Sequence, residues 1–64
     1  MKIRFQCFLV TAQTLHMGKA AEILFLSQQA ISEQIKRLEK EYDTTLFYRK
    51  PKLSLTPSGM ILLE

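Results

Sequence analysis

Only two residues, Phe25 and Leu26, connect one helical pattern in this sequence to Ser27 at the head of the next, and this short connection limits the possible folds more than any other feature. The first pattern, KAAEIL (residues 19–24), has Ala20, Ala21 and Leu24 on one side. The second covers residues 28–42 and places its apolar residues on one face, at Ile31, Ile35, Leu38 and Tyr42. A linker this short forces a sharp corner and disfavours a long antiparallel hairpin, which predicts a helix-turn-helix.

A further helix is predicted over residues 3–14, where apolar residues follow the i, i+3, i+4, i+7 spacing of an amphipathic helix at Phe5, Phe8, Leu9 and Ala12. Ser27 stands where its hydroxyl can cap the helix over residues 28–42. The chain has 64 residues, enough for one small core. A second complete domain is therefore excluded.

The periodicity changes after Asp43. The segments TLFYR and LSLT are rich in β-forming residues and are separated by KPK, which predicts a two-stranded hairpin within residues 46–56. Thr56 followed by Pro57 predicts the start of a fourth helix. The last residues, MILLE, are apolar around most of the helix circumference, so we expect a longer protein or a partner for this helix.

The formal net charge of +3 and a pI near 9.3 favour polyanionic partners only weakly. Helix 28–42 is neutral, whereas Arg49, Lys50 and Lys52 have no acidic neighbour in the sequence. Cys7 is the single cysteine, which predicts a structural thiol and an intracellular protein. No signal peptide or membrane span is recognisable, which supports a cytoplasmic location.

Catalytic and metal-binding functions are disfavoured. The chain has one histidine and one cysteine, and no paired carboxylates at a recognisable spacing. We therefore expect no enzyme activity, no metal site and no cofactor.

The segments KAAEILFLSQQAISEQIKRLEKEY, LFYR and LSLTPSG closely resemble the amino-terminal winged helix-turn-helix domain of LysR-type transcriptional regulators. The matching residues are Ala20, Ala21, Leu24, Ser27, Gln28, Ser32, Gln34, Ile35, Leu38, Glu39, Leu46, Phe47, Arg49, Leu55, Thr56 and Gly59. The resemblance implies a mainly α fold with a three-helix core, a short two-stranded β wing and the start of a linker helix. It assigns residues 1–56 to the DNA-binding domain and residues 57–64 to the linker helix.

The same resemblance implies partners. In this family the linker helix pairs two subunits, so a homodimer is expected, with higher oligomers possible in a full-length protein. A carboxy-terminal effector-sensing domain would follow the linker helix, and the present chain does not contain one. The implied ligand is double-stranded DNA at an operator or promoter.

The resemblance also indicates which residues contact DNA. Helix 28–42 would lie in the major groove, with base edges read by Gln28, Gln29, Ser32 and Glu33. The predicted backbone contacts are Lys36 on this helix, Lys19 before it, and Arg49 and Lys52 in the wing, which would lie on the backbone or the minor groove. For Ser27, a cap alone and a cap with a phosphate contact both remain open.

Three departures from the family pattern stand out. Gln29 replaces the usual proline, and Asp43 replaces the glycine that commonly ends this helix. His16, Met17 and Gly18 replace a serine, an aromatic residue and a threonine or serine, so a capping hydroxyl is missing. His16 can be a phosphate contact or a partly exposed structural residue. The alternative function is a winged-helix module for protein contacts alone, which the neutral charge of helix 28–42 supports.

Overall fold

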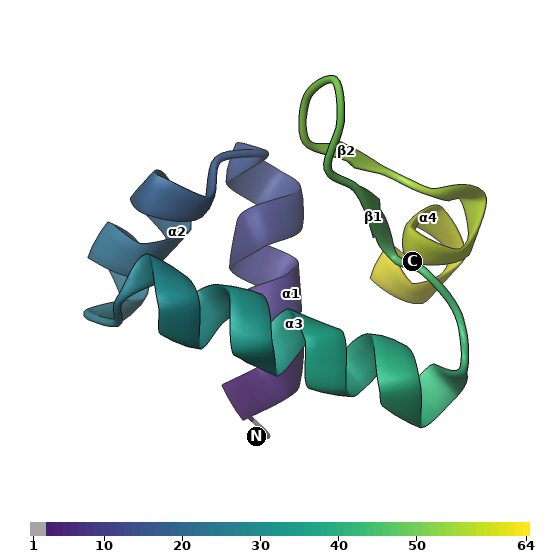
Figure 1. The fold of residues 1–64 in the computed structure, drawn as a ribbon, viewed down its shortest axis with the longest axis horizontal. Coiled ribbons are helices and arrows are strands. Elements are labelled where there is room, and N and C mark those ends of the chain that lie inside the picture. Colours follow the sequence, from purple (N-terminus) through teal and green to yellow (C-terminus); the bar gives the residue numbers. More distant parts are fainter. Residues whose placement is uncertain (1–2) are drawn as a thin grey trace.

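The computed structural model describes residues 3–64 and shows a mainly α, winged helix-turn-helix fold, as predicted (Figure 1). The first two residues of the predicted domain, Met1 and Lys2, lie outside the described part. The elements are α1 (Ile3–Thr14), α2 (Met17–Leu24), α3 (Gln28–Tyr42), β1 (Phe47–Tyr48), β2 (Ser54–Leu55) and α4 (Pro57–Leu63). In Figure 1, α3 crosses in front of α1, with α2 on one side and the hairpin and α4 on the other.

The predicted corner between α2 and α3 is present. Phe25 adopts a left-handed conformation with φ 56°, which ends α2. The N–H of Leu26 then donates to the Ala21 carbonyl at 2.9 Å, and this hydrogen bond closes the last turn of α2. Ser27 caps α3 by accepting from the Ala30 N–H at 3.0 Å, as predicted.

Helix α2 begins at Met17, two residues before its predicted start. Its cap is His16, whose Nδ1 accepts from the Lys19 N–H at 3.1 Å. The imidazole thus satisfies an N–H group for which the sequence offered no hydroxyl. Gly18 consequently lies within the first turn of α2 and does not interrupt it.

The core lies between the first three helices. Its fully buried side chains include Cys7 and Phe8 from α1, Ala20 from α2, and Ile31 and Ile35 from α3. Burial raises the pKa of the Cys7 thiol, which suits the structural role predicted for it.

Tyr42 was wrongly predicted to lie on the buried face of α3. It is 54% exposed. Tyr42 is the last residue of the helix, where it lines a hollow together with Leu46, Ile61 and Leu62. These neighbours leave more than half of its surface exposed, so the apolar face of α3 is not covered at its last turn.

The hairpin is formed by two paired strands and is held against α1 and α3. Strands β1 and β2 pair antiparallel, with Phe47 opposite Leu55. The Phe47 ring packs on Phe8 of α1 with 5.6 Å between ring centroids. The Glu39 carboxylate accepts from the N–H groups of Leu46 at 2.8 Å and Phe47 at 3.3 Å, which ties α3 to the start of β1.

Helix α4 begins as predicted, with Thr56 as its cap and Pro57 at its first position. The Thr56 hydroxyl accepts from the Gly59 N–H at 3.0 Å and donates to the Thr45 carbonyl at 2.6 Å. Beyond Gly59 the helix is poorly covered, and Met60, Ile61 and Leu63 are exposed. None of the helices within residues 3–64 is both long and apolar enough to span a membrane.

Candidate nucleic-acid interface

The outward face of α3 forms a shallow polar hollow. It is lined by Gln29, Ser32, Glu33 and Lys36, four of the residues predicted to contact DNA. Three of them are exposed and Ser32 is half-buried. This face stands opposite Ile31, Ile35 and Leu38 because side chains three and four positions apart share one side of a helix.

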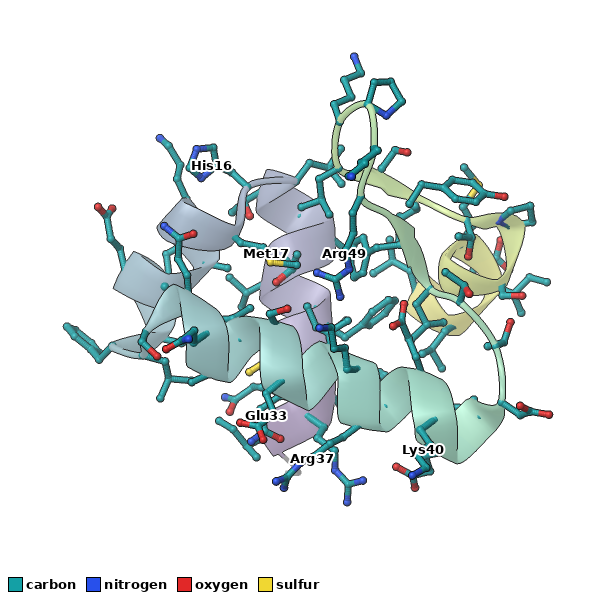
Figure 2. All side chains as sticks on the ribbon, in the orientation of Figure 1. His16, Met17, Glu33, Arg37, Lys40 and Arg49 are labelled. Carbon is teal, nitrogen blue, oxygen red and sulfur yellow. The ribbon has the colours of Figure 1, made fainter. Side chains whose placement is uncertain are left out.

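Arg49 brings the hairpin to this face. Its Nη1 atom lies 3.3 Å from the Ser32 hydroxyl and 3.7 Å from the Met17 sulfur, so one guanidinium contacts both helices of the helix-turn-helix. Figure 2 shows Arg49 reaching from the hairpin toward Met17 and α3. The predicted wing residue therefore joins the wing to α3.

Glu33 has a partner on its own helix. Its Oε2 atom lies 3.4 Å from Nη2 of Arg37, one turn further along, in an exposed ion pair. In Figure 2, Glu33 and Arg37 lie on the side of α3 away from Arg49. The carboxylate of Glu33, which is predicted to read a base, is thus partly neutralised by Arg37.

Gln28 lies beside the start of α2. Its Nε2 atom and the His16 ring both lie close to Gly18. A Cβ atom added to Gly18 would be 3.1 Å from Gln28 Nε2 and 2.9 Å from His16 Cε1. A hollow here includes Lys19 as well. The structure therefore brings together His16, predicted as either a phosphate contact or a structural residue, and Lys19 and Gln28, both predicted to bind DNA.

The cations predicted to contact DNA are not neutralised within the described residues 3–64. The ion pairs in that part of the chain join Arg4 to Glu41 and Arg37 to Glu33. Lys19, Lys36, Arg49 and Lys52 are exposed and take part in neither. Their side chains are available to an anionic partner.

Sequence reasoning missed Met17 and Arg37 at this surface. Met17 is 32 positions from Arg49, and no local pattern could indicate that contact. Arg37 lies four positions after Glu33, a spacing that favours an ion pair and could have been read from the sequence. In the part of the chain that the structure describes, no three metal-ligating side chains are grouped to hold an ion.

Comparison with known proteins matches residues 4–60 to a family described as bacterial regulatory helix-turn-helix protein, lysR family. The regulator AlsR of Bacillus subtilis is 43% identical, with all of this chain and 22% of AlsR aligned. The regulator HdfR of Yersinia enterocolitica is 44% identical over 88% of this chain and 20% of HdfR. The chain thus spans about a fifth of the length of these relatives.

Solved structures show the same fold. A LysR-family transcriptional regulator from Eggerthella lenta has a TM-score of 0.89 and 40% identity over 97% of this chain and 90% of that one. The BenM DNA-binding domain, crystallised in complex with its catB site 1 DNA, has a TM-score of 0.90 and 28% identity over 98% of this chain and 73% of that one. The arrangement of α3 and the hairpin is therefore shared with a domain solved on DNA.

Proposed function

Because this chain belongs to the lysR family of bacterial regulatory helix-turn-helix proteins, we propose that it binds double-stranded DNA sequence-specifically as part of a transcriptional regulator. Helix α3 would occupy the major groove, and the wing would lie on the backbone or the adjacent minor groove. The observation that carries this proposal is the outward polar face of α3, flanked by cations that form no ion pair within residues 3–64. The likeness to the BenM domain solved on DNA supports the same docking.

Base readout is assigned to Gln28, Gln29, Ser32 and Glu33. A glutamine amide can bond adenine through two atoms, a serine hydroxyl can donate or accept, and a glutamate can accept from cytosine. Gln29 has the greatest freedom for this role, since it is exposed in the first turn of α3 and borders the polar hollow. Glu33 would have to read a base while Arg37 lies beside its carboxylate.

Backbone contacts are assigned to Lys19, Lys36, Arg49 and Lys52, which would position the protein without selecting sequence. Ser27 can share in this role. Its oxygen already accepts from Ala30, but its hydroxyl hydrogen has no acceptor among the described residues and could donate to a phosphate. A protonated His16 would lose its cap, so a phosphate contact there would use the neutral ring through Nε2–H.

Pairing of two copies is assigned to α4, as the start of a linker helix over residues 57–64. The exposed side chains of Met60, Ile61 and Leu63 provide an apolar surface that a second α4 would cover. Two copies would place two α3 helices on half-sites, which increases both affinity and specificity. A higher oligomer would require a full-length protein.

Selection of bound duplexes from a random pool, followed by salt titration of the selected sequence, tests this function. We expect an enriched sequence and an affinity that falls with salt, with a slope of about 0.9 per phosphate contacted. Lys52→Ala should weaken binding equally on all sequences and reduce that slope by about one contact. A lack of enrichment, with no duplex bound at low salt, would instead favour the module for protein contacts.

A further inference from the structure

The contact between the wing and α3 determines how one base-reading side chain can form hydrogen bonds. We infer that Arg49 makes the Ser32 hydroxyl a hydrogen-bond donor toward DNA, so that Ser32 selects a base that offers an acceptor. This inference rests on the proposed DNA binding. It goes further because it assigns Arg49 a positioning role in specificity, in addition to contact with the DNA backbone.

The direction follows from the chemistry of the two groups. A guanidinium has only N–H donors, so in the 3.3 Å contact with Arg49 the Ser32 oxygen must accept. A hydroxyl carries a single hydrogen, which that contact leaves unused. Ser32 also makes no bond back to a helix carbonyl within residues 3–64, in contrast to Thr14, whose hydroxyl donates to the Val10 carbonyl at 3.0 Å. Within the described part of the chain the Ser32 hydrogen thus has no acceptor, and it can be donated to DNA.

The geometry keeps this arrangement in place. Arg49 stands two residues after Phe47, which is buried against Phe8, so its main chain is held by the core. Its guanidinium also contacts the Met17 sulfur at 3.7 Å, on the helix next to α3. Figure 2 shows Arg49 between the hairpin and these helices. Ser32 meanwhile borders the outward hollow together with Gln29 and Lys36.

The expected preference can be stated for each base. In the major groove, guanine offers N7 and O6, thymine offers O4 and adenine offers N7, whereas cytosine offers only an amino donor. A serine free to rotate can serve any of them. With Arg49 in place, one of the two lone pairs of the Ser32 oxygen is occupied while its hydrogen has no partner within residues 3–64, so Ser32 should favour a base that offers an acceptor over cytosine at the position that it reads.

The experiment begins with the duplex selected by the wild-type chain. Ser32→Ala identifies the position at which base preference is lost, and fluorescence anisotropy then gives the ratio of affinities for the preferred base and for cytosine. Arg49→Met and Lys52→Met form a matched pair, since each removes one positive charge from the wing. Both should weaken binding to every sequence, and such uniform losses cancel in the ratio.

We expect Arg49→Met to reduce the ratio about fivefold, the effect of one well-oriented hydrogen bond, and Lys52→Met to leave it unchanged. Ser32→Ala should lower this affinity ratio strongly in the wild type. In a chain that already carries Arg49→Met, the same substitution should lower it much less. Arg49 is exposed, and circular dichroism would verify that the variant is folded.

Several results would overturn the inference while leaving DNA binding intact. These are a preference for cytosine at the position that Ser32 reads, no position affected by Ser32→Ala, or equal effects of Ser32→Ala with and without Arg49. A chain that enriches no sequence would overturn both the proposed function and this inference.

Discussion

Helices α3 and α4 begin in the same way but end in different surroundings. Each starts on a hydroxyl cap, Ser27 for α3 and Thr56 for α4. The apolar face of α3 is enclosed by the chain itself, and Ile35 is completely buried. On α4 only Gly59 is buried, and Ile61 is 72% exposed.

The difference shows that the two helices depend on different partners. The apolar residues of α3 stabilise the domain that presents its polar face outward. Those of α4 contribute little to this domain, because most of their surface remains in contact with water. Their apolarity is better explained by the proposed pairing of two copies. Four substitutions test this comparison, in order of decreasing expected effect on the free energy of unfolding.

Ile35→Ala should lower the free energy of unfolding by about 3 kcal/mol, because it leaves a cavity in a closely packed core. A domain of this size has only about 3–10 kcal/mol in total, so the variant would be largely unfolded on mild warming. Urea denaturation followed by circular dichroism measures the change. A loss below about 1 kcal/mol would mean that α3 is not packed as described.

Gly59→Ala should destabilise the chain by about 2 kcal/mol, even though alanine favours helices. A Cβ at this position would collide with the Leu46 carbonyl oxygen and lie 2.7 Å from Leu55 Cδ2. The matched control is Gly18→Ala in α2, where the atoms nearest to the added Cβ belong to the side chains of His16 and Gln28 and not to the backbone. Equal stability of the two variants in thermal melts would contradict the close approach of α4 to the hairpin.

Thr56→Ala should cost more than Ser27→Ala, for which about 1 kcal/mol is expected from the loss of a cap. Thr56 is buried and bonds both Gly59 and Thr45, so its removal also leaves a carbonyl without a partner. Thr56→Ser keeps the hydroxyl and should recover most of the loss. Chemical denaturation of the three variants would give this order, and the reverse order would show that the second bond has no importance.

Ile61→Ser should change the stability of the isolated chain by less than about 0.5 kcal/mol, since the side chain is largely exposed. Its effect should appear instead in self-association, as a weaker dimer in sedimentation equilibrium. Ile23→Ser, the same change at an exposed isoleucine of α2, serves as the control. If Ile61→Ser destabilised the monomer as much as Ile35→Ala does, the contrast between α3 and α4 would be wrong.

Local signals in the sequence were sufficient for most of the fold. The bounds of α1 and α3, the caps at Ser27 and Thr56, and the hairpin followed from periodicity and from hydrogen bonds that span a few residues. The start of α2 was missed because an imidazole, rather than a hydroxyl, accepts from the Lys19 N–H. Tyr42 was misplaced because periodicity shows which way a side chain points and not whether another element covers it.

By itself, the sequence determined the order of the elements, the face that α3 buries, and the polar residues left on the other face, since these depend on spacing along the chain. Only the tertiary structure decided that Arg49 reaches both Ser32 and Met17, that Glu39 holds the start of β1, and that a closely approaching carbonyl makes Gly59 necessary. Except for the shorter link from Glu39, these contacts join residues more than a dozen positions apart. They arise because the core fixes the hairpin against the helices, and no local preference encodes them.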